Sequence, residues 1–137
     1  MTRNYNFACI QAAVEVIDDP SRKDAVIARN LDRSLRIAES VIRKDDAKVI
    51  VFPEGWLQGH NHLRSADDWK AVCIQVPGLE TARIGEFARK HRVYIAGAAF
   101  EHDLDWPEGP ATPAVRFMLL LKMLLRRYRV VCESIRI

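Results

Sequence analysis

Segments typical of strands and segments typical of helices alternate along most of this chain. Apolar and β-branched residues fill positions 6–16, 47–53 and 92–100, as they do in buried strands. Between these runs, residues 24–43 and 79–91 repeat their apolar side chains at the spacing of one helical face. This alternation predicts an α/β fold, in which the two helices pack on one face of a mixed sheet.

The length and composition are those of one globular domain, expected over residues 1–137. Of the 137 residues, 49% are hydrophobic and 28% are charged. The net charge of +3 is small, and the excess is concentrated between Arg116 and Arg136, where six basic residues face one acid. We therefore predict no nucleic-acid partner. The sequence contains no run of about 18 apolar residues, so no membrane-spanning helix is expected.

The cysteines and histidines predict neither a disulfide framework nor a metal site. Cys9, Cys73 and Cys132 are odd in number, widely spaced and without a CxxC pair, which favours a reducing compartment such as the cytoplasm. His60 and His62 could ligate a metal at i, i+2, but no third ligand follows at a recognisable spacing. We expect no cofactor and no metal.

A carboxylate follows the second predicted strand. Pro53 stops the apolar run, and Glu54, Gly55 and Trp56 come next. An ordinary glutamate in such a turn is solvated and has no special role. Ligands of α/β sheets, however, bind at the carboxyl ends of strands, and the long polar connection over 55–77 is typical of a functional loop. Glu54 is therefore a candidate site residue, and we expect its side chain to be largely buried.

Taken in order, these segments resemble the nitrilase, or carbon–nitrogen hydrolase, superfamily. "FACIQAAV" is similar to the first strand of the family, and "NLDRSLRIAESVIRKDDAKVIVFPEGWLQG" to its helix–strand–Glu unit. "PGLETARIGEFARKHRVYIAGAAFE" is similar to the helix and strand that follow. The resemblance covers residues 5 to about 106. It implies part of an αββα-type sandwich, an incomplete domain that is shortened internally and at its C-terminus, and a small-molecule amide or nitrile as substrate.

The resemblance also implies a catalytic triad. The family uses a Cys nucleophile, a Glu general base and a Lys that stabilises the oxyanion, which nominates Cys132, Glu54 and Lys122. Glu54 matches the Pro-Glu motif, and Cys132 lies in "VVCESIRI", which is similar to the strand-end pattern of the family. The Tyr-Arg-Lys stretch of the family reads Tyr-Arg-Val at 128–130. The family lysine position therefore falls either on Lys122 or in the stretch Arg127–Arg129.

The spacing of two of these residues limits the activity that we expect. Lys122 and Cys132 are ten positions apart, whereas neighbouring parallel strands need a crossover of a dozen or more residues. Both cannot then occupy the places that the family gives them, so hydrolysis by this chain should be very weak or absent. One alternative is a non-catalytic remnant of the family that keeps Glu54.

A second alternative rests on the basic and apolar stretch over 115–130. Such a segment could bind a membrane surface or a partner helix, although its charges do not gather on one helical face. We rank it last and expect no membrane partner. A sheet with helices on one face only would expose an apolar patch, so we expect the chain to form homo-oligomers.

Overall fold

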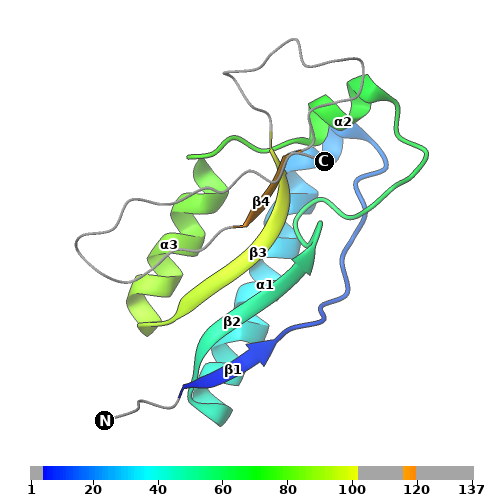
Figure 1. Ribbon diagram of the computed structural model, residues 1–137. Coiled ribbons are helices and arrows are strands. Elements are labelled where there is room, and N and C mark those ends of the chain that lie inside the picture. The colour runs from blue at the N-terminus through cyan, green and yellow to red at the C-terminus, as the bar shows by residue number, and fades with distance from the viewer. Residues whose placement is uncertain (1–4, 102–115, 120–137) are drawn as a thin grey trace.

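A mixed sheet forms the centre of the fold in the computed structural model, which describes residues 5–101 and 116–119 (Figure 1). The strands in these residues lie in the order β1 (Asn6–Cys9), β2 (Ala47–Glu54), β3 (Tyr94–Glu101) and β4 (Arg116–Leu119). β1, β2 and β3 are parallel, and β4 pairs with β3 in the antiparallel sense. The predicted α/β class and mixed sheet are confirmed.

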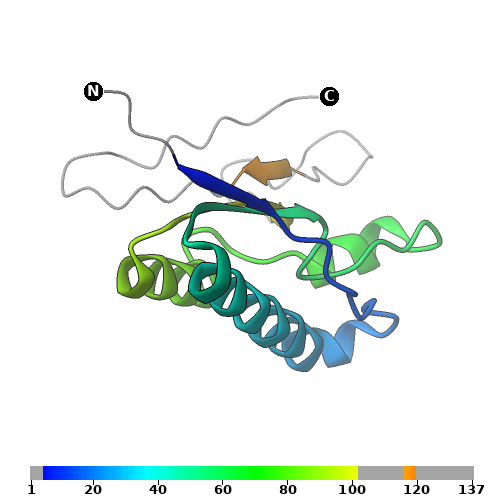
Figure 2. The same cartoon turned by 90° about the horizontal axis from the view of Figure 1, so that it is seen from below.

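Both long helices lie on one face of this sheet, as Figure 2 shows. They are α1 (Lys23–Asp45), which follows the short 3-10 helix η1 (Pro20–Arg22), and α3 (Leu79–His91). A further helix, α2 (Ala66–Val72), lies in the long connection after β2. The two helices on one face were predicted, and α3 has the predicted bounds. No helix in the described part of the chain is long and apolar enough to cross a membrane.

The core lies between the sheet and the two long helices. Ile50 of β2 pairs with Ile95 of β3, and both side chains are fully buried against α1 and α3. Paired residues share a face, so the opposite face carries the row Phe7, Val49 and Tyr94. The Phe7 side chain is 62% exposed. Val49 and Tyr94 are half-buried, so among the described residues this row is more exposed than Ile50 and Ile95 on the helix side.

The first strand is shorter than its apolar sequence predicts. Pairing of β1 ends at Cys9, with one further bond from the Ile10 N–H to the Val51 carbonyl, whereas the prediction extended to residue 16. Beyond this point the backbone is bonded by side chains of α1 instead of by a strand. Arg33 donates to the Ala13 carbonyl, and Asn30 bonds the backbone of Glu15. Helix α1 thus replaces the sheet as the partner of this segment.

Candidate functional site

The backbone of β2 is irregular just before Glu54. Val51 pairs with Ala96 of β3, but Glu54 pairs with Ala98, so three steps on one strand match two on the other. This is a β-bulge, and a slip of one residue turns the following side chain to the other face of the sheet. Glu54 therefore shares the face of Val51 and Ala96, which is the face opposite the helices. Without the bulge it would point toward the core beneath Ile50.

Pro53 lies inside this bulge. Proline has no backbone N–H, and within sheets it is confined to edges, strand starts and bulges. The bulge already interrupts the ladder at this position, so the missing donor costs no regular hydrogen bond. The Pro-Glu pair therefore fits the bulge: Pro53 occupies a position that needs no backbone donor, and the bulge sets the direction of the Glu54 side chain.

A tight loop follows Glu54 and returns the chain to it. The Gly59 N–H donates to the Gly55 carbonyl at 2.7 Å, and both glycines have positive φ angles, +63° at Gly55 and +69° at Gly59. Trp56, Leu57 and Gln58, between them, are fully buried. The loop is therefore anchored by its own side chains, and the next residue leaves it in a fixed direction.

Two of these buried side chains attach the loop to the sheet. The Trp56 ring stacks on Phe52 of β2, with centroids 4.2 Å apart and planes 4° apart. The Gln58 amide donates to the Phe100 carbonyl at 2.8 Å and accepts the Phe100 N–H at 3.4 Å. Gln58 thus bonds the end of β3 as a neighbouring strand would. Within the described residues, Trp56 belongs to the core.

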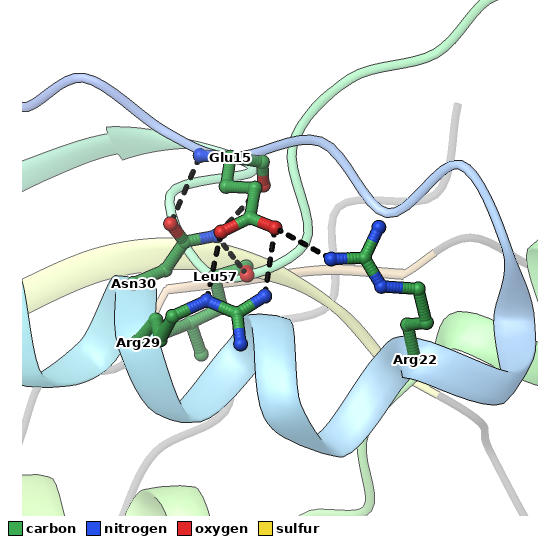
Figure 3. A network of polar contacts seen from close by, with 5 residues as sticks. All are labelled: Glu15, Arg22, Arg29, Asn30 and Leu57. Atoms are coloured by element: carbon green, nitrogen blue, oxygen red, sulfur yellow. Dashed lines mark hydrogen bonds and ion pairs between the residues drawn. The ribbon is translucent and has the colours of Figure 1, made fainter.

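Helix α1 holds the same loop from the other side through Asn30 (Figure 3). The Asn30 amide donates to the carbonyls of Glu15 and Leu57 at 2.8 and 2.9 Å, and its oxygen accepts the Glu15 N–H at 2.9 Å. Arg29 holds the Glu15 carboxylate with two bonds of 2.9 and 2.7 Å, and Arg22 approaches it at 3.4 Å. The bond from Arg29 lowers the pKa of the Glu15 carboxyl.

His60, the first residue after the loop, reaches back to Glu54. The Nε2 atom of His60 lies 3.5 Å from Oε1 of Glu54, and the two side chains are 46% and 47% exposed. The expectation that Glu54 is largely buried was therefore wrong. The bulge turns its side chain away from the core, and among the described residues the imidazole of His60 lies beside it.

Aromatic rings surround the imidazole of His60. Its centroid lies 4.8 Å from that of His62, 5.8 Å from Trp69 of α2 and 5.7 Å from Phe100 of β3. The Arg64 guanidinium lies over the Trp69 ring, 4.4 Å from its centroid. Three separate segments, the loop, α2 and β3, thus meet beside Glu54.

Arg64 ties the loop to the segment before α1. Its guanidinium donates to the backbone carbonyls of Ile17, Gln58 and Gly59, at distances between 2.7 and 3.3 Å. Burial lowers the pKa of Arg64 from its usual value. Its N–H groups are committed to these carbonyls, so Arg64 holds the loop in place.

A comparison with known proteins identifies the family of this chain. The sequence model of the family described as carbon-nitrogen hydrolase matches residues 7–122. The chain belongs to this family. A relative, Nitrilase 1 of Arabidopsis thaliana, is 31% identical over an alignment of 72 residues, and the match covers 42% of this chain and 21% of Nitrilase 1. The chain thus matches about a fifth of the length of that relative.

Of the three predicted triad residues, the structure describes Glu54. Lys122 and Cys132 lie outside the described residues, as does the stretch Arg127–Arg129. The basic apolar stretch over 115–130 also lies outside them, apart from β4.

The two cysteines within the described residues differ in their surroundings. Both are free thiols; Cys9 is exposed and Cys73 is buried. Burial raises the pKa of the Cys73 thiol to about 11, so it stays protonated at neutral pH and is a poor nucleophile. Neither matches the strand-end motif that nominated Cys132.

The sequence interpretation missed the contact of His60 with Glu54 and considered this histidine only as a metal ligand. No group of three or more His, Cys, Asp or Glu side chains within the described residues could hold a metal ion. The sequence does contain a signal for the contact with Glu54. Glycines at positions 55 and 59 bracket a run that returns on itself, which brings residues 54 and 60 together.

Proposed function

We propose that this chain acts on the carbon–nitrogen bond of a small non-peptide amide or nitrile, with Glu54 as general base. One observation carries the proposal: in a member of the family, a bulge turns Glu54 out of the core at the carboxyl ends of the parallel strands β1, β2 and β3. Ligands of such sheets bind at this edge. Half of the Glu54 side chain is open there to a reacting group.

The proposed reaction of an amide proceeds through a thioester. Glu54 takes the proton of the Cys132 thiol, whose sulfur attacks the carbonyl carbon, and the resulting oxyanion is stabilised by Lys122. The C–N bond then breaks, and the amine leaves with the proton from Glu54. Water attacks the thioester, Glu54 takes a proton from it, and the acid and free thiol are released. A base is needed because an ordinary thiol has a pKa of about 8.5.

The last described strand, β4, ends close to Glu54 and shortly before Lys122 in the sequence. Leu119 of β4 pairs with Ala98, which itself pairs with Glu54, and Lys122 is three positions further along the sequence. This supports Lys122 as the cation, with the stretch Arg127–Arg129 as the alternative. The ten positions between Lys122 and Cys132 argue that one of the two roles is poorly filled, so we expect turnover to be slow.

Alkylation of the cysteines tests the proposed pair of Glu54 and Cys132. Iodoacetamide is applied between about pH 5 and pH 9, and the rate at each thiol is read by peptide mapping. Cys132 should react at neutral pH and slow by about tenfold or more in Glu54→Gln, because the base that removes its proton is gone. Cys73, with its pKa raised to about 11, should stay slow over the whole range in both proteins.

Release of ammonia from a panel of short amides and nitriles completes this test. Slow release that is lost in both Glu54→Gln and Cys132→Ala would support the proposed hydrolysis. If Cys132 reacts at the same rate with and without Glu54, and no substrate is turned over, the chain is a non-catalytic remnant of the family.

We also propose that the chain self-associates in the cytoplasm through the sheet face that carries Phe7. Phe7 is 62% exposed on this face, and burying it against a second copy would remove apolar surface from water. Sedimentation velocity at micromolar concentration should show a species larger than the monomer. Phe7→Lys should shift it toward the monomer.

Leu79→Lys is the matched control for this prediction. Leu79 is also an exposed apolar residue, at 82%, but it begins α3 on the helix side of the molecule. A wild-type chain that sediments as a compact monomer would contradict the proposal, as would equal effects of the two substitutions.

A further inference from the structure

The loop between Glu54 and His60 fixes the direction in which the histidine leaves it. Its ends are joined by the bond from Gly59 to Gly55, and its three central side chains are buried. Asn30 of α1 and Arg64 hold its carbonyls at Leu57, Gln58 and Gly59. A loop held at so many backbone atoms loses little further entropy when it presents a side chain.

The imidazole of His60 is also supported after it leaves the loop. Trp69 and Phe100 meet it edge to face, with interplanar angles of 76° and 77°, and Trp69 in turn contacts Phe100. Edge-to-face pairs of rings at these separations are favourable and directional. The Nε2 atom is therefore held toward Glu54, even though about half of the side chain is exposed.

We propose that His60 is a positioning residue for Glu54 in the hydrolysis proposed above, on which this inference rests. With a proton on Nε2, the imidazole donates toward Oε1 of Glu54, 3.5 Å away, in either the neutral or the charged form of the ring. The contact restricts the rotation of the carboxylate. The second oxygen, Oε2, then remains available to take the proton of the thiol.

Other basic groups near this contact are occupied or further from the carboxylate. The N–H groups of Arg64 donate to three backbone carbonyls, and its guanidinium lies over Trp69. His62 contacts the ring of His60. Among the described residues, the ion pair that Glu54 forms is with His60. The positioning role therefore falls to His60 rather than to its basic neighbours.

Two substitutions separate this role from simple packing. His60→Phe keeps a ring against Trp69 and Phe100 but removes Nε2, and His60→Gln keeps a side-chain N–H at a similar reach. We expect His60→Phe to lower kcat by about tenfold with little change in KM, and His60→Gln to restore much of it. Leu63→Ala, at a 93% exposed position three residues further on, is the control and should leave both unchanged.

An NMR measurement tests the contact without relying on turnover. The histidine nitrogens are labelled with ¹⁵N, and their spectra are compared at one pH in the wild type and in Glu54→Gln. We expect the His60 Nε2 resonance to shift, because its carboxylate partner becomes a neutral amide. The resonances of His91 should not shift, since His91 lies on α3 beside Glu39.

The outcomes separate this inference from the proposed function. A His60 resonance unmoved by Glu54→Gln overturns the inference even if the chain hydrolyses amides. An unchanged kcat in His60→Phe overturns it as well, as does a loss that His60→Gln does not restore. A shifted resonance in a wild type that turns over no substrate shows the contact, but removes the proposed function and with it the positioning role.

Discussion

Replacing Gly59 by alanine should destabilise the fold by about 2–5 kcal/mol, the sum of a backbone cost and a steric cost. Gly59 has a φ angle of +69°, which L-residues with a side chain rarely adopt. A Cβ atom there would lie 2.7 Å from Cα of Val16 and 3.0 Å from its Cγ2. The backbone of the segment before α1 would have to move, because a main-chain atom cannot rotate out of the way.

Urea unfolding of Gly59→Ala measures this loss, and Gly55→Ala is its matched control. Gly55 has nearly the same φ angle, +63°, but its Cβ would meet the ring of Phe100 at 3.3 Å, which asks for a much smaller adjustment. Gly55→Ala should therefore cost only about 1–2 kcal/mol, chiefly from the backbone. Equal losses of unfolding free energy in the two variants would show that the clash of the added Cβ with Val16 costs no stability.

Replacing Asn30 by leucine should cost about 2–4 kcal/mol. Leucine has nearly the same shape as asparagine but forms no hydrogen bonds. It would leave the Glu15 N–H and the carbonyls of Glu15 and Leu57 without their partner. Each buried polar group left unpaired costs about 1–3 kcal/mol, and part of this is recovered if water enters.

The control for Asn30 is a second asparagine with an exposed bond. The Asn6 amide donates to the Asp45 carbonyl at 2.6 Å at the surface, where water replaces a lost partner. Asn6→Leu should therefore change the free energy of unfolding by less than about 1 kcal/mol. If urea unfolding gives the two variants the same stability, the bonds of Asn30 to Glu15 and Leu57 do not stabilise the fold.

Much of the fold could be predicted from the sequence because the apolar spacing is regular. Helix α3 has the predicted bounds, since the Thr81 side chain satisfies the backbone at its start and Arg92 ends it at a φ of +55°. The first strand was predicted too long. Its apolar residues are also those of a segment packed on α1, and the sequence does not show that Asn30 supplies the bonds of a missing strand.

The candidate site could be predicted in part. Glu54 was identified from the Pro-Glu pair that ends an apolar strand and from its resemblance to the family. Its exposure was predicted wrongly, because the face to which it points depends on a shift of one residue in pairing with β3. Pairing registers are set by contacts between strands distant in the sequence. The contact with His60 was missed because it depends on Gly55 and Gly59, whose left-handed backbone conformations close the loop.

The bulge before Glu54 makes the number of residues in β2 matter as much as their identity. A conservative exchange at Val51 alters packing, but leaves the count between the last regular pair and the glutamate intact. Loss or gain of a single codon in this short stretch would exchange the inner and outer sides of the strand end, and would place a carboxylate against the hydrophobic core. Evolution of this strand is therefore constrained differently by point mutations and by insertions or deletions, and the latter are far less tolerable.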